Sequence, residues 1–369
     1  MKQPKMINPP LYRGSTVLFD TYEDLLSVYD GTYEGSVYGT DRLLNQRLFE
    51  EALLKLEGGY LTRAFQSGLS AIQNTLMAFT KSGDHILICD NAYGPGMYFS
   101  KKILSRFNIE ADVIPSDVGA DIKKYIKPNT RFILLESPGS ITFEIQDIPA
   151  ITKIAQGKNI VTALDNTWAT PLYLKPFELG VDISIQSVTK YIAGHSDVLL
   201  GAVTTNEKYA AQFEKFYSTM ELFAQPEDCY LALRGLETLE LRLKEHERSA
   251  LEIAHWLKSL DIIDTVIHPA LPEHPQHEIW KRDFSGSTGI FSFIFKKDYA
   301  TETIAKFVNT LNLFGIGFSW GGYKSLITVG KNRRVFDSAY KDKTFIRLNI
   351  GLEKTDDLMR DLDKGFSVL

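Results

Sequence analysis

Residues 182–197 read DISIQSVTKYIAGHSD, and the rest of the chain is organised around this stretch. Apolar residues alternate with polar ones up to Gln186, which predicts a strand. Ser187, Thr189 and Lys190 follow at once. A lysine in this position suits an amine that forms a Schiff base with a phosphorylated aldehyde, since the two hydroxyls can donate to phosphate oxygens. Most lysines that follow strands are solvated surface charges, so the assignment needs support from elsewhere in the chain.

Composition indicates a soluble globular protein with room for two domains. The 369 residues are 44% hydrophobic and 24% charged, and the formal net charge is −5 without long runs of one sign. This argues against a nucleic-acid-binding surface. Cys89 and Cys229 stand in apolar settings and are expected to be reduced core thiols. With neither an apolar run of about 18 residues nor a signal-peptide pattern, we expect a cytoplasmic protein without a membrane partner.

Short apolar runs alternate with helical segments in the first two thirds of the chain. This order predicts an α/β fold with a mainly parallel sheet covered on both faces. The runs are 86–89, 132–135, 160–164, 183–185 and 199–203. Ligands of such folds bind at the carboxyl ends of the strands. Polar and aromatic residues follow these ends at 90–94, 136–140, 165–168 and 187–190.

The chain divides into three parts. Residues 1–42 are rich in Pro, Gly, Ser and Tyr, and we expect this arm to contact a neighbouring subunit. Residues 43–236 carry the predicted sheet. A long amphipathic helix begins near residue 237 and leads into a smaller α+β domain at 237–369. In its last predicted strand, Arg347 faces away from the apolar side and towards solvent or a cleft.

A pyridoxal phosphate site requires several groups together, and the chain has a candidate for each. Lys190 supplies the amine, Asp165 a carboxylate for the pyridine nitrogen, and Tyr93 an aromatic lid in a loop that we expect to be flexible. The phosphate needs N–H and O–H donors, for which we name Ser67, Gly68, Leu69, Ser187 and Thr189. Arg347 suits an amino-acid carboxylate. Each has an ordinary alternative: a turn aspartate, a surface tyrosine, a helix N-cap at Ser67 and a salt-bridge arginine.

Other kinds of site have weaker support. His268, His274 and His277 stand in a Pro-rich loop without a metal-ligand pattern, so we expect no metal. The glycine-rich turns do not form G-x-G-x-x-G, which disfavours a dinucleotide oxidoreductase. His195 is expected to orient the loop after Lys190.

With these residues assembled, the chain resembles the cysteine/methionine-metabolism family of pyridoxal phosphate enzymes from about Leu11 to its C-terminus. The resemblance is carried by the string from Ser187 to Asp197. Three further strings resemble β-acting rather than γ-acting members: ESPGSIT from Glu136, SWGGY from Ser319 and KRDFSGS from Lys281.

The resemblance implies a fold-type-I large domain and a homotetramer built as a dimer of dimers. It assigns to Lys190, Asp165, Tyr93, Ser187, Thr189, Gly68 and Leu69 the roles given above. It adds Ser319 beside Arg347 at the substrate carboxylate, Trp320 and Tyr230 as pocket walls, and Tyr38 at the phosphate of the neighbouring subunit. The implied activity is β-elimination that cleaves L-cystathionine to homocysteine, pyruvate and ammonia. Racemisation of alanine is a chemically reasonable side activity. The alternatives are a γ-lyase or γ-synthase activity and a non-catalytic binding module on the same fold.

Two departures from the family pattern bear on these expectations. Thr40 stands where the family usually has an arginine that grips the neighbouring phosphate, and Arg42 is the candidate substitute. Lys324 stands where similar sequences usually have glutamate, which bears on substrate preference.

Overall fold

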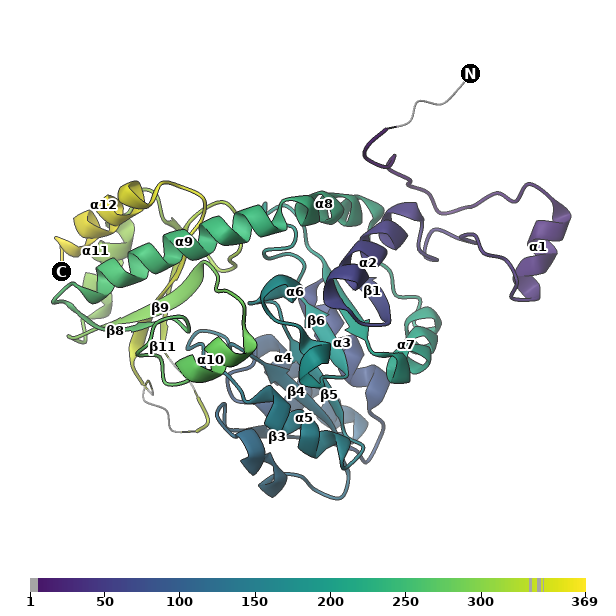
Figure 1. Cartoon of the computed structure of the whole chain (residues 1–369), viewed down its shortest axis with the longest axis horizontal. Coiled ribbons are helices and arrows are strands. Elements are labelled where there is room, and N and C mark those ends of the chain that lie inside the picture. Colours follow the sequence, from purple (N-terminus) through teal and green to yellow (C-terminus); the bar gives the residue numbers. More distant parts are fainter. Residues whose placement is uncertain (1–5, 332–333, 337–339, 341) are drawn as a thin grey trace.

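The computed structural model describes residues 6–331, 334–336, 340 and 342–369. Figure 1 shows a body built around two sheets, with an arm that extends away from it. The arm carries α1 (Tyr22–Tyr29), which begins at a capping box on Thr21 and has no buried residue. A helix without a buried residue gains little from packing within its own chain, which fits the expected contact with another subunit.

The larger sheet has the strand order β1-β7-β6-β5-β4-β2-β3. Its strands are β1 (Leu61–Phe65), β2 (His85–Cys89), β3 (Glu110–Ile114), β4 (Thr130–Glu136), β5 (Val161–Asp165), β6 (Ile183–Gln186) and β7 (Gly201–Thr205). Neighbours from β6 to β3 are parallel, whereas β7 runs antiparallel to both β6 and β1. The mainly parallel sheet expected from the sequence is therefore confirmed, with one reversed strand that the apolar pattern did not reveal.

Helices pack around this sheet, and its apolar residues join theirs in two buried hydrophobic clusters. They are α2 (Leu44–Glu57), α3 (Gly68–Phe79), α4 (Gly94–Tyr98), α5 (Ile148–Gln156), α6 (Thr170–Tyr173), α7 (Glu207–Thr219) and α8 (Pro226–Glu237). Because strand β2 is buried along its whole length, residues 86–89 read in the sequence as an apolar run. Cys89 and Cys229 are free and buried in these layers, as expected.

The long helix α9 (Leu239–Lys258) runs from the larger sheet to the smaller one (Figure 1). The smaller sheet has the order β10-β11-β12-β9-β8. Its strands are β8 (Ile263–Ile267), β9 (Ile290–Phe295), β10 (Gly315–Ile316), β11 (Leu326–Lys331) and β12 (Thr344–Asn349), with helices α10 (His277–Asp283), α11 (Thr301–Thr310) and α12 (Thr355–Phe366).

The side chains of strand β12 alternate between two environments, the core of the smaller domain and the face towards the larger sheet. Ile346 and Leu348 join the core between the smaller sheet and its helices, whereas Phe345 packs against the core of the larger sheet. Arg347 lies on the Phe345 side and lines a cavity between the two sheets. The alternation expected from the sequence is confirmed.

Candidate active site

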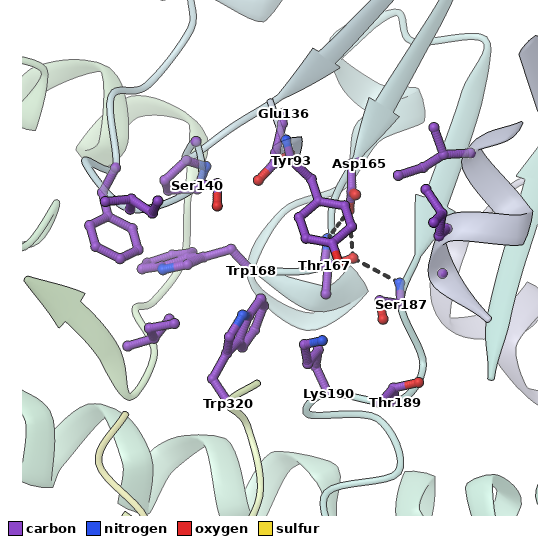
Figure 2. Close-up of a pocket in the computed structure, with 18 of the residues that line it drawn as sticks. Tyr93, Glu136, Ser140, Asp165, Thr167, Trp168, Ser187, Thr189, Lys190 and Trp320 are labelled. Carbon is purple, nitrogen blue, oxygen red and sulfur yellow. Dashed lines mark hydrogen bonds between the residues drawn. The ribbon is translucent and has the colours of Figure 1, made fainter. Parts of the chain in front are cut away.

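A cavity lies at the carboxyl ends of the parallel strands and encloses about 890 Å³ including its open mouth. Ten of the residues expected from the sequence line it: Ser67, Gly68, Leu69, Tyr93, Asp165, Ser187, Thr189, Lys190, Trp320 and Arg347. They come from segments as far apart as α3 and β12, so the fold brings together residues that are distant in the sequence. Figure 2 shows Lys190, Asp165 and Tyr93 facing one another across this space.

Lys190 stands in a tight turn directly after β6. Its backbone N–H donates to the Ser187 carbonyl at 3.0 Å, and its carbonyl accepts from the N–H of Gly194 at 2.8 Å. His195 Nδ1 lies 2.7 Å from the Ala193 carbonyl, so it contacts the same turn. Burial lowers the pKa of Lys190 and nearby Arg347 lowers it further, although Asp165 and Glu136 oppose the shift. A lowered pKa increases the neutral fraction of the amine, which is the form that attacks a carbonyl.

Asp165 ends β5 beside Lys190. Its Oδ1 accepts from the backbone N–H of Thr167 at 3.1 Å and from the Thr167 hydroxyl at 2.5 Å. The same hydroxyl oxygen accepts from the N–H of Ser187 at 2.8 Å, which joins the end of β5 to the lysine turn. Burial raises the pKa of Asp165 from its ordinary value, opposed by the Thr167 hydrogen bonds and by Lys190. The sequence reasoning named Thr167 only as part of a strand-end segment and missed this bridge.

Ser67 caps helix α3 and places its first turn at the cavity. The Ser67 hydroxyl oxygen accepts from the N–H of Ser70 at 3.1 Å, so the ordinary N-cap reading holds. The N–H groups of Gly68 and Leu69 lie in the first turn of the helix, where intrahelical acceptors are lacking, so the end also suits an anion. A Cβ on Gly68 would lie 2.6 Å from Ser187 Cβ, so the close approach of α3 to the lysine turn requires glycine.

Thr189 differs from a simple phosphate donor. Its hydroxyl oxygen lies 3.1 Å from the Leu200 carbonyl and accepts from the N–H of Leu200 at 2.9 Å. The Thr189 hydroxyl proton therefore points to the Leu200 carbonyl in this structure. The Ser187 hydroxyl and the backbone N–H groups of α3 are better placed to donate to a phosphate.

Tyr93 lies at the start of a helix, where the sequence predicted a loop. It is the N-cap of α4, and its backbone N–H donates to Glu136 Oε2 at 2.5 Å. Pro95 at the start of α4 favours the helix, because the fixed φ of proline suits the first turn. Burial raises the pKa of Tyr93, and the carboxyls of Glu136 and Asp165 add to the shift.

Three expected residues lie away from the cavity in this single chain. Tyr230 stands on α8 and lines a groove beside residues 6–9, while its neighbour Cys229 joins the core, so its role as a pocket wall stays a prediction. Ser319 is exposed, with a φ of 62° that turns the backbone before Trp320. Tyr38 is in the arm, paired with Thr16, and its contact with a neighbouring subunit stays a prediction.

The two departures from the family pattern have a structural context. Arg42 Nε lies 2.7 Å from Glu50 Oε2, so this guanidinium is already engaged within its own chain. The Thr40 hydroxyl donates to Glu221 at 3.1 Å. Lys324 Nζ lies 3.9 Å from Glu353 and does not line the cavity.

Several cavity residues were not assigned as site residues from the sequence. They are Ile72, Glu136, Pro138, Gly139, Ser140, Ile141, Phe143, Thr167, Trp168, Leu199 and Ile290. Most are apolar and come from loops after β4 and β5, so they carry no chemical signature in the sequence. Glu136 could have been found by the signal used for Asp165, since both are acids that end a strand. Among the described residues, no cluster of three or more His, Cys, Asp or Glu is arranged to hold a metal ion.

The cavity fits pyridoxal phosphate. It brings together the Lys190 amine, whose pKa is lowered, and the Asp165 carboxyl group at the end of the neighbouring strand. It also contains the unpaired N–H groups of the first turn of α3, which approaches the lysine turn so closely that Gly68 must be glycine. The fold and this site define a pyridoxal-phosphate-dependent enzyme of fold type I.

Comparisons with known proteins agree with this class. Residues 1–367 match the family described as Cys/Met metabolism PLP-dependent enzyme, and the chain belongs to this family. It is 38% identical to the Escherichia coli K12 protein named cystathionine beta-lyase MetC, over 98% of this chain and 93% of that protein. It is 40% identical to the Wolbachia pipientis wMel protein named L-alanine/L-glutamate racemase, with the same coverage. The crystal structure of metB from Corynebacterium glutamicum superposes with a TM-score of 0.90 at 29% identity, over 98% of this chain and 93% of that one.

Proposed function

We propose that this protein is a carbon–sulfur lyase that cleaves L-cystathionine by β-elimination to homocysteine, pyruvate and ammonia. The observation that carries the proposal is the meeting of Lys190, Asp165 and Arg347 in one cavity. When bound, pyridoxal phosphate supplies an electron-withdrawing ring that stabilises negative charge at the substrate α-carbon. The relative in E. coli named cystathionine beta-lyase supports the choice of substrate.

Each residue has a proposed part in the reaction. Arg347 binds the substrate carboxylate, since a guanidinium can hold both oxygens. Lys190 first holds the cofactor and then removes the α-proton as a neutral amine. Asp165 keeps a proton on the pyridine nitrogen, and Trp320 with Trp168 excludes water from one side of the cavity. Lys190 or Tyr93 gives a proton to the sulfur that leaves the β-carbon, so that homocysteine departs as a thiol. The aminoacrylate that remains takes up one water and gives pyruvate and ammonia.

The test is to incubate the purified protein with L-cystathionine and identify both products. Homocysteine with pyruvate is the expected result. Cysteine with 2-oxobutyrate would assign the γ-lyase alternative, and no product together with retained cofactor would favour a binding module.

Racemisation of alanine is a second candidate function. The Wolbachia relative named as a racemase favours it. The chemistry needs only that a proton return to the α-carbon from the other face, and Lys190 and Tyr93 both line the cavity as candidate donors. The rate of D-alanine formation from L-alanine, compared with the rate of cystathionine cleavage, measures the racemase activity relative to the lyase activity.

We also propose a cytoplasmic homotetramer made of an arm at 1–42, a cofactor domain at 43–236 and a C-terminal domain at 237–369. Support comes from the extended arm and its helix α1, which has no buried residue in the single chain. Among the described residues, no helix is long and apolar enough to cross a membrane. Light scattering on the purified protein would measure the assembly.

A further inference from the structure

Glu136 is a second carboxyl group at the cavity, and the mechanism above gives it no part. It ends β4 and lies in register with Asp165 of the neighbouring strand β5. Figure 2 shows its carboxyl group next to Tyr93. Its backbone N–H donates to Cys89 Sγ at 3.3 Å, which fixes the strand end to β2.

The contact between Glu136 and Tyr93 joins two strand ends that are 43 residues apart in the sequence. Oε2 of Glu136 accepts the backbone N–H of Tyr93 at 2.5 Å. This N–H precedes α4, and the Tyr93 carbonyl accepts from the N–H of Met97 at 3.1 Å. The bond therefore fixes the peptide group from which the Tyr93 ring extends into the cavity.

The segment before Tyr93 is held separately. Asn91 Oδ1 accepts from Gln146 at 3.0 Å, and Asn91 Nδ2 donates to the Glu144 carbonyl at 3.1 Å. The Asn91 carbonyl accepts from the N–H of Ser140 at 2.8 Å. Because these bonds anchor the turn without Glu136, its removal is expected to shift the direction of the Tyr93 ring rather than to unfold the segment.

We propose that Glu136 is a positioning residue that aims the Tyr93 ring at the cofactor through the Tyr93 backbone N–H. Burial and Asp165 raise the pKa of Glu136 well above its ordinary value, which favours the neutral form of the carboxyl group that accepts this hydrogen bond. A neutral acceptor also spares the cavity a second negative charge beside Asp165. The inference rests on the proposed function only in that it takes pyridoxal phosphate as the cofactor.

The experiment measures cofactor binding by the full-length protein after removal and re-addition of pyridoxal phosphate. Glu136→Met keeps the volume of the side chain and removes the acceptor. We expect its dissociation constant for the cofactor to rise about tenfold, the range of one hydrogen bond, with a smaller circular dichroism signal in the cofactor band. Glu136→Gln keeps an acceptor oxygen and is expected to stay within about twofold of the wild type.

A double-mutant cycle separates positioning from an independent role. In a Tyr93→Ala background, Glu136→Met is expected to change the dissociation constant by less than about twofold, because the ring that Glu136 aims is gone. If Glu136→Met does not fold, Glu136→Asp provides the same comparison, since its shorter side chain withdraws the acceptor. Wild-type binding by Glu136→Met, an equal loss in Glu136→Gln, or additive losses in the double variant would overturn the proposal. These readouts do not depend on lyase turnover, so a failure of the proposed function would leave them unchanged.

Discussion

The Lys190 ammonium nitrogen lies 5.4 Å from the centre of the Trp320 ring, so the turn after β6 meets the segment before β11 inside one cavity. An indole face attracts a cation but does not replace its hydration. The pKa of Lys190 is therefore lowered by burial in spite of this contact. The position of Trp320 follows from Gly321, whose φ is +81° and where a Cβ would lie 2.8 Å from the Tyr191 backbone nitrogen.

Lys190→Ala is expected to abolish covalent attachment of pyridoxal phosphate and essentially all turnover, because an alanine has no amine to form the bond. The measurement is the absorbance band near the visible edge, together with borohydride trapping of the cofactor. Lys324→Ala is the control, since Lys324 pairs with Glu353 outside the cavity. A Lys190→Ala protein that retained both the band and turnover would refute the assignment.

The pH dependence of cofactor attachment should report the pKa of Lys190. Arg347 lowers this pKa, so Arg347→Gln is expected to raise it and reduce the neutral amine at a given pH. The rate of pyridoxal phosphate attachment to the cofactor-free protein rises with pH as the amine loses its proton. We expect the midpoint of this rise to move to higher pH in the variant. A midpoint that stays in place or moves to lower pH would show that the guanidinium does not act on Lys190.

Gly68→Ala tests the approach of α3 to the lysine turn. The added methyl group would lie 2.6 Å from Ser187 Cβ and 2.7 Å from its Oγ, closer than real contacts allow. The helix end must then move away from Ser187, and we expect pyridoxal phosphate affinity to fall by at least about tenfold, the cost of at least one lost hydrogen bond. Titration of the cofactor-free protein measures this, with Gly94→Ala as the control because a Cβ there meets no atom within 4 Å. Equal affinities in the two variants would contradict the prediction.

The sequence predicted those parts of the site that one strand or one turn determines. Lys190 and Asp165 could be named because buried parallel strands read as apolar runs and their ends lie at one edge of the sheet. The direction of β7 could not be predicted, since an apolar run has the same pattern in a parallel and in an antiparallel strand. The contact of Glu136 with Tyr93 depends on the packing of β4 beside β2, which no local pattern encodes. The place of Tyr230 on α8, outside the cavity of this chain, could not be predicted either, because a family resemblance gives a position in the chain but not the face of a helix.

Glu57 predicts a pH dependence of stability that is separate from the active site. It ends α2 behind β6, where its Oε1 accepts from Ser184 at 3.0 Å and from Gln186 at 2.9 Å. Burial raises its pKa from 4.5 to about 7 despite these two hydrogen bonds. The folded state therefore retains a proton that the unfolded state loses. Stability contributed by this group is complete below about pH 4.5 and falls as the pH rises to about 7, by about 3 kcal/mol at most.

Glu57→Gln should remove this dependence, because an amide oxygen accepts the same hydrogen bonds and carries no charge at any pH. We expect the variant to be more stable than the wild type at pH 8 and to differ little from it at pH 4.5. Urea unfolding at both values measures the difference, with Glu178→Gln as a control for the loss of one negative charge at an exposed position. A wild type whose advantage grows with pH relative to Glu57→Gln would mean that Glu57 is ionised and stabilising in the folded protein, and burial would then not govern its titration.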